Sequence, residues 1–165
     1  MGLKNSLKQW NGKDTHKLAE LYELKQSSNT FIDDLCECLK REETERGASW
    51  LLKYALEQNM VFSEAQQDFL IDALPDLMHW EAKLHILQSM PYMTFKPKHK
   101  AALTRFIEMQ LAHENKFVRA WAYSGLAVLR DTYHELAGEC EMRLKHALEN
   151  ETAASVKARI RQVLK

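Results

Sequence analysis

Residues 114–129 read ENKFVRAWAYSGLAVL, and this stretch decides the fold that the sequence predicts. Counted from Val118, small or apolar residues fall at offsets 0, +4 and +8, on one face of a helix. The same pattern recurs from residues 48, 82 and 156, at intervals of 34, 36 and 38 residues. The twelve positions are Ala48, Leu52, Leu56, Ala82, Ile86, Met90, Val118, Ala122, Leu126, Val156, Ile160 and Leu164. A nearly constant period in this range predicts stacked helical repeats, in which neighbouring copies bury each other's apolar faces.

The rest of the chain also favours helices. No segment of useful length alternates apolar and polar residues with the period of a strand, so we predict an all-α fold. The expected helix pairs are 29–42 with 44–58, 63–74 with 78–90, 97–112 with 115–130, and 131–149 with 152–164. A helix over 14–25 is expected to cover the front of the array, because a terminal repeat lacks one neighbour. Residues 1–13 are assigned to an N-terminal tail or frayed helix, and residues 14–165 to a single domain.

The segment around Val118 resembles the second helix of a HEAT repeat. That pattern has an acidic or amide turn (here Glu114-Asn115), then Val118-Arg119, then small and leucine positions at helical spacing. The last copy is similar, with Val156-Lys157, whereas the first departs most. The resemblance covers about residues 28–165. It implies a right-handed α-solenoid of about four HEAT-like helix pairs with an N-terminal helical cap, whose second helices line a concave side.

Charge is distributed unevenly along a chain that is neutral as a whole. The 165 residues include 23 Lys and Arg and 23 Asp and Glu. Residues 1–45 carry 7 basic and 9 acidic side chains, residues 46–95 carry 3 and 6, and residues 96–165 carry 13 and 8. A neutral protein of this kind can still offer one basic face to an acidic partner.

Cysteine usage and hydropathy narrow the class of protein. The three cysteines, Cys36, Cys38 and Cys140, cannot all pair within the chain. Cys36 and Cys38 point about 200° apart on a helix, so they cannot form a disulfide with each other. We therefore expect reduced thiols in a cytoplasmic protein. No apolar run approaches the roughly 20 residues that span a bilayer. His134-Glu135-Leu136-Ala137-Gly138 has Gly138 where a zinc-protease motif needs its second histidine. We therefore predict no membrane association, no metal, no cofactor and no catalytic residues.

The candidate binding residues form a column beside the core positions of the recurring helices. Offset +1 carries Ser49, Lys83, Arg119 and Lys157, and offset +5 carries Lys53, Leu87, Tyr123 and Arg161. We predict that the basic members and Tyr123 line one groove with Trp80. The predicted partner-binding residues are Lys53, Trp80, Lys83, Arg119, Tyr123, Lys157 and Arg161. The alternative follows from the HEAT resemblance, in which the arginine of Val-Arg commonly bonds to an acid in a turn. Asp76, Glu114 and Glu151 are available for such pairs within the fold.

These features predict a binding protein rather than an enzyme. The first hypothesis is a non-enzymatic adaptor or scaffold that holds a protein or peptide in the concave groove. The alternative is a nucleic-acid-binding or DNA-repair protein, because HEAT-like alkylpurine DNA glycosylases share the architecture that the resemblance implies. A solenoid enzyme of another type, such as a bilin-lyase relative, is a third possibility. The sequence leaves the oligomeric state and the partner open.

Overall fold

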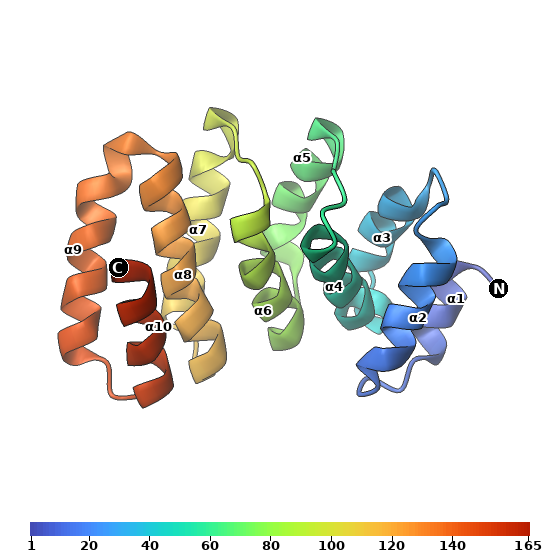
Figure 1. Ribbon diagram of the computed structural model, residues 1–165, viewed down its shortest axis with the longest axis horizontal. Coiled ribbons are helices and arrows are strands. Elements are labelled where there is room, and N and C mark those ends of the chain that lie inside the picture. The colour runs from blue at the N-terminus through green and yellow to red at the C-terminus, as the bar shows by residue number, and fades with distance from the viewer. The chain divides into compact units, whose positions relative to one another are not determined.

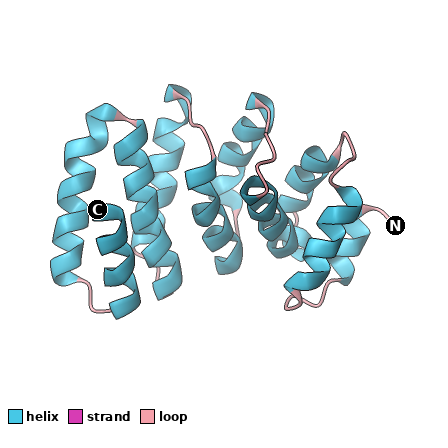
Figure 2. Ribbon diagram, in the orientation of Figure 1, coloured by secondary structure: helices cyan, strands magenta, loops and turns pink.

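The computed structural model describes all residues from Met1 to Lys165, and its regular elements are all helices, which confirms the all-α prediction. Figure 2 shows helices joined by short loops, without strands. The backbone contacts divide the chain into two compact units, Met1–Tyr92 and Met93–Lys165. We call them the amino-terminal and carboxy-terminal units. The assignment of residues 14–165 to one domain stays a prediction.

The amino-terminal unit is built around its longest helix. Its α-helices are α1 (Leu3–Gln9), α2 (Thr15–Lys25), α3 (Phe31–Leu39), α4 (Glu42–Glu57), α5 (Glu64–Ala73) and α6 (Trp80–Ser89) (Figure 1). The helix α4 contacts α1, α2, α3 and α6, while α3 also contacts α5. Two short 3₁₀ turns, Leu74–Asp76 and Met90–Tyr92, follow α5 and α6. The helix α1 is part of this core, because its Leu3 and Leu7 are buried.

The carboxy-terminal unit is built around α8. A 3₁₀ turn at Pro97–His99 leads into α7 (Lys100–Leu111), which is followed by α8 (Lys116–Thr132), α9 (Ala137–Asn150) and α10 (Ala154–Leu164) (Figure 1). The helix α8 contacts α7, α9 and α10, and α9 contacts α10. The unit thus contains two successive helix pairs, α7 with α8 and α9 with α10.

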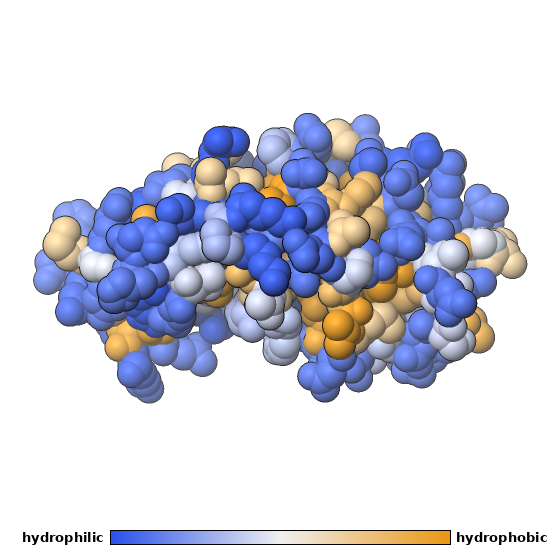
Figure 3. Space-filling model, turned by 90° about the horizontal axis from the view of Figure 1, so that it is seen from above, coloured by the Kyte–Doolittle hydropathy of each residue, from blue (hydrophilic) through white to orange (hydrophobic).

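The recurring apolar positions form the cores of both units. Eleven of the twelve are buried, as the pattern predicts for residues that face neighbouring helices. Only Leu164 is partly exposed. On the face that Figure 3 shows, most of the surface is hydrophilic and apolar groups gather at a few places. No helix is both long and apolar enough to cross a membrane.

Side-chain caps mark the starts of α2, α5 and α8. Ser63 and Gln66 form a capping box at the start of α5, and the Asn115 side chain accepts hydrogen bonds from the first backbone N–H groups of α8. The junction after α8 differs from the prediction that Asp131 opens a helix over 131–149. Instead α8 continues to Thr132, and the buried Tyr133 is extended and donates a hydrogen bond from its hydroxyl to Lys96 O at 2.7 Å. The prediction was wrong here because a long-range contact of Tyr133 sets the break.

Candidate functional site

The predicted binding residues fall on both units. Lys53, Trp80 and Lys83 lie on α4 and α6 of the amino-terminal unit. The other four, Arg119, Tyr123, Lys157 and Arg161, lie on α8 and α10 of the carboxy-terminal unit. Each group is therefore described within its own unit.

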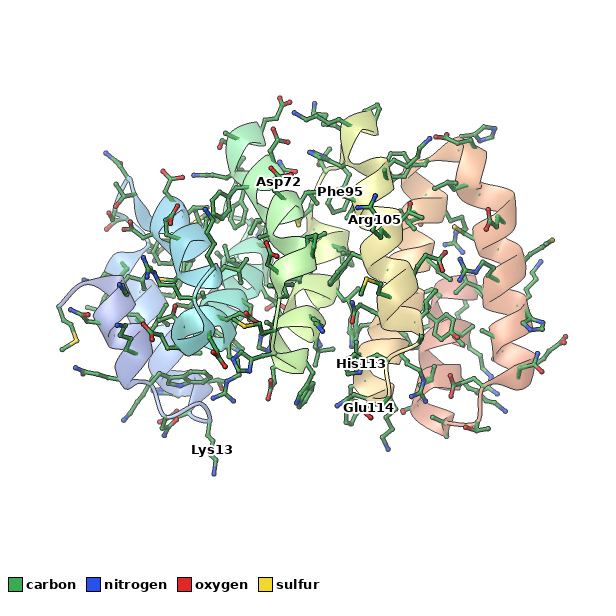
Figure 4. All side chains as sticks on the ribbon, turned by 180° about the vertical axis from the view of Figure 1, so that it is seen from behind. Lys13, Asp72, Phe95, Arg105, His113 and Glu114 are labelled. Carbon is green, nitrogen blue, oxygen red and sulfur yellow. The ribbon has the colours of Figure 1, made fainter.

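Arg119 is held inside the fold by a carboxylate of the next helix pair. Its Nη2 and Nε donate to the two carboxylate oxygens of Glu151 at 3.0 and 3.3 Å, and Nη1 donates to the carbonyls of His113 and Glu114. His113 and Glu114 form the turn before α8 (Figure 4). The arginine lowers the pKa of Glu151, whose Oε1 also accepts from Thr152 N and Ala153 N at the start of α10. The alternative of a structural ion pair is thus what the structure shows for Arg119.

Tyr123, one turn further along α8, lines a cleft against α9. The cleft has a volume of about 500 Å³ and is lined by Leu111, Tyr123, Met142, Arg143, His146, Ala147, Asn150 and Glu151. Burial raises the pKa of Tyr123, and the Glu151 carboxylate adds to the rise. Arg143 is occupied by a two-pronged ion pair with Glu108 of α7. The cleft therefore combines apolar walls with charges that are already neutralised in pairs.

The corresponding column on α4 also faces the next helix pair. Ser49, at offset +1, is fully buried and donates to Arg46 O at 2.9 Å. The Nδ1 of His85 on α6 lies 2.8 Å from the same hydroxyl oxygen, and it donates to Ser49 Oγ when the hydroxyl proton is directed to Arg46 O. Burial, with a smaller effect of Lys53, lowers the pKa of His85 to about 4. Lys53, at offset +5, forms an ion pair with Glu57 on its own helix at 3.0 Å.

Trp80 and Lys83 lie in the first turn of α6. The Trp80 side chain is 40% exposed, whereas Lys83 is partly exposed and forms no ion pair. Beside them, Glu45 of α4 is 1% exposed and accepts hydrogen bonds from Met78 N and His79 N at 2.7–3.1 Å. The Glu45 carboxylate thus accepts hydrogen bonds from the backbone N–H groups directly before α6, as the Glu151 carboxylate does directly before α10.

The cations of α10 differ from Arg119 because they have no acidic partner. Lys157 is partly exposed, Arg161 and Lys165 are exposed, and none of the three forms a side-chain hydrogen bond or ion pair. We call these three residues the α10 basic face. Arg159 lies on the other side of the helix, with its guanidinium carbon 4.0 Å from the centroid of the Trp121 ring on α8. Residues two apart on a helix point about 200° apart, so the α10 basic face points away from α8.

The structure offers little for catalysis. The Ser49–His85 contact has the elements of a nucleophile and base, but Ser49 is inaccessible and its proton is directed to a backbone carbonyl. All three cysteines are buried and free, and burial raises the pKa of the Cys36 thiol to about 12. No group of three or more His, Cys, Asp or Glu side chains is placed to hold a metal ion. Sequence reasoning missed the role of Glu45 and the contact between His85 and Ser49. The other copies have no glutamate at the offset of Glu45 and no histidine at the offset of His85, so the repeat pattern did not point to either.

Comparison with known proteins adds no relative: the chain matches no family model, no curated protein and no solved structure.

Proposed function

We propose that this chain is a non-enzymatic adaptor, a short HEAT-like α-solenoid that binds a protein or peptide. The recurring helices bury eleven of the twelve repeated apolar positions, all but Leu164, which supports a repeat architecture. Such proteins present extended surfaces on which partners dock. We also propose a cytoplasmic location, which the free thiols of all three cysteines support.

The observation that carries the binding role is the unpaired charge of the α10 basic face. Elsewhere in the carboxy-terminal unit, Arg119, Arg130, Arg143 and Lys100 each contact a carboxylate at hydrogen-bonding distance. No acidic residue occurs between Thr152 and Lys165 to neutralise α10. Exposed and unneutralised cations on one helix face attract an acidic partner.

A protein partner fits this surface better than nucleic acid. Duplex DNA carries one charge per about 1.7 Å, and proteins that grip it commonly neutralise six to ten phosphates. The α10 basic face offers three cations, fewer than the phosphate contacts that proteins of that kind make. DNA binding or repair is therefore the second hypothesis, and the first experiment separates the two.

The experiment is capture of partners from an extract of the source cells, with nuclease treatment in one arm. The bait is the full chain, compared with the double variant Lys157→Glu, Arg161→Glu. A defined protein that survives nuclease, is released by about 0.5 M salt and is lost with the double variant supports the adaptor. Recovery that disappears with nuclease overturns it in favour of nucleic-acid binding. Turnover of a small-molecule substrate by the purified chain would also contradict a non-enzymatic role.

A further inference from the structure

Within each unit, the column at offsets +1 and +5 contacts the helix pair that follows it in the chain. On α4 its members Ser49 and Lys53 act on His85, which belongs to the following helix pair. On α8, Arg119 binds Glu151 of the following pair, and Tyr123 lines the cleft against α9 of that pair. The column is therefore the side of α4 and of α8 that receives the next helix pair. Its role in the fold is to dock helices.

On α10 the same column is uncovered. Its positions are Lys157 at offset +1 and Arg161 at offset +5, with Lys165 one turn further. The stacking of Arg159 on Trp121 fixes the opposite side of α10 against α8, so the uncovered column faces outward.

A second observation concerns the apolar core. Leu164, at offset +8, is partly exposed, whereas the equivalent Leu56, Met90 and Leu126 are 6%, 1% and 1% exposed. Leu164 is three residues after Arg161, so the two side chains are neighbours on the helix surface. The outward side of α10 thus combines three unpaired cations with an apolar position that every other copy buries.

We propose that this side of α10 is the docking surface for an acidic helical segment of a partner protein. The inference rests on the proposed adaptor function and names its site and the chemistry of its partner. Carboxylates of the incoming segment bind Lys157 and Arg161 as Glu151 binds Arg119, and an apolar side chain covers Leu164. Cations four residues apart are spaced by about 6 Å along the axis, which matches carboxylates at i, i+4 and i+8 of a second helix.

The probe is a synthetic helical peptide with glutamates at i, i+4 and i+8 and leucines flanking that face. A control peptide has the same composition with the glutamates distributed around the helix. Binding to the full chain is measured by fluorescence anisotropy at 50 and 500 mM salt. We expect the patterned peptide to bind at least tenfold more tightly than the control peptide, and the higher salt to weaken binding at least tenfold. Equal binding of the two peptides overturns the proposal, because it indicates charge attraction without a docked helix.

Variants of the chain locate the surface. Lys157→Glu with Arg161→Glu should lower the affinity at least tenfold, and Leu164→Ala should lower it severalfold. A matched control, Lys13→Glu with Lys116→Glu, makes the same change in net charge at two exposed sites. Lys13 lies in the loop between α1 and α2 (Figure 4), and Lys116 is the first residue of α8. This control should leave the affinity for the patterned peptide unchanged. The decisive test is a charge exchange: a peptide with lysines in place of its glutamates should bind the reversed variant and not the native chain. Failure of this rescue overturns the proposal, as does tighter binding of a DNA duplex through the same residues.

The peptide and capture experiments fail in different ways. If a protein partner is captured equally well by the native chain and by the Lys157→Glu, Arg161→Glu variant, the adaptor function is supported and the proposed docking surface is overturned. If the patterned peptide binds and the charge exchange succeeds, the docking surface is supported. If the capture experiment then recovers only nucleic acid, the adaptor function is overturned while the docking surface is not.

Discussion

Arg119 and Arg161 belong to the same column of the recurring helices but have different surroundings. Arg119 joins Glu151 to two backbone carbonyls, and the Glu151 side chain is only 10% exposed. Replacing Arg119 by Ala leaves that carboxylate without its cation, and we expect a loss of about 1–3 kcal/mol in the free energy of unfolding, less than for a fully buried pair. Arg161→Ala should change it by less than about 0.5 kcal/mol, because Arg161 is exposed and unpaired. Urea denaturation measures both, and equal losses would contradict the structural role of Arg119.

His85 makes the stability of the amino-terminal unit depend on pH. Its pKa in the folded chain is about 4, below the value of about 6.5 expected in the unfolded chain. Between these values the unfolded state binds more protons, so the free energy of unfolding rises with pH. Stability is therefore complete above about pH 6.5 and is lost as the pH falls toward 4, by on the order of 1–3 kcal/mol from this residue.

The variant His85→Asn isolates this effect. An asparagine amide reaches the position of Nδ1 and donates the same hydrogen bond to Ser49, but it does not titrate. Urea denaturation at pH 7.0, 5.5 and 4.5 should show a smaller decline for the variant than for the native chain. Parallel declines would show that the carboxylates alone account for acid destabilisation.

At the scale of the helix, the N-terminus of α6 depends on a side chain from another helix. His79, the residue before α6, supplies no side-chain cap, and Glu45 of α4 accepts the hydrogen bonds of Met78 N and His79 N instead. Glu45→Ala should lower the free energy of unfolding by about 1–3 kcal/mol, because it removes the acceptor of two part-buried donors and opens a small cavity where the buried carboxylate lay. Hydrogen exchange should show faster exchange of the Met78 and His79 amides.

Glu43 provides the matched control for Glu45. Both lie in the first turn of α4, but the Glu43 side chain is 55% exposed and pairs with Lys8 at the surface. Glu43→Ala should leave the free energy of unfolding and the amide exchange at Met78 nearly unchanged, because the ion pair that it removes is solvent-exposed. A similar effect of the two substitutions would mean that Glu45 acts through the charge of α4 rather than by capping α6.

The helices themselves were predictable because their information is local. The spacing of Val118, Ala122 and Leu126 identifies a buried face without reference to any other part of the chain. The end of α8 was not predictable in this way. It depends on Tyr133, whose hydroxyl bonds to Lys96, 37 residues earlier. Asp131, the first residue of the predicted helix 131–149, lies within α8 and pairs with Arg130.

The candidate site was predictable only as a set of residues. Helical spacing places Arg119 and Lys157 in one column, but it does not say which neighbour that column faces. The direction depends on how successive helix pairs pack, and it appears only in the contacts of Arg119 with Glu151 and of Arg159 with Trp121. The sequence therefore could not distinguish an engaged cation from a free one.

At the scale of the whole molecule, the boundary between the two compact units predicts where a protease cuts first. Tyr92 is 54% exposed, and residues 93–96 beyond its 3₁₀ turn have no regular structure. Phe117 and Trp80 are also exposed, but they lie within α8 and α6, whose backbone hydrogen bonds resist binding in a protease cleft.

We expect limited chymotrypsin digestion to cleave first after Tyr92, giving fragments 1–92 and 93–165 that mass spectrometry identifies. Each unit buries its own recurring positions, such as Leu52 in the first and Ile160 in the second. Both fragments should therefore persist longer than the intact chain under the same conditions, because a compact core shields the remaining sites. The substitution Tyr92→Thr should slow the first cut at least tenfold. A first cut within α8, or fragments degraded as fast as they form, would show that the boundary at Tyr92 does not separate two independently stable units.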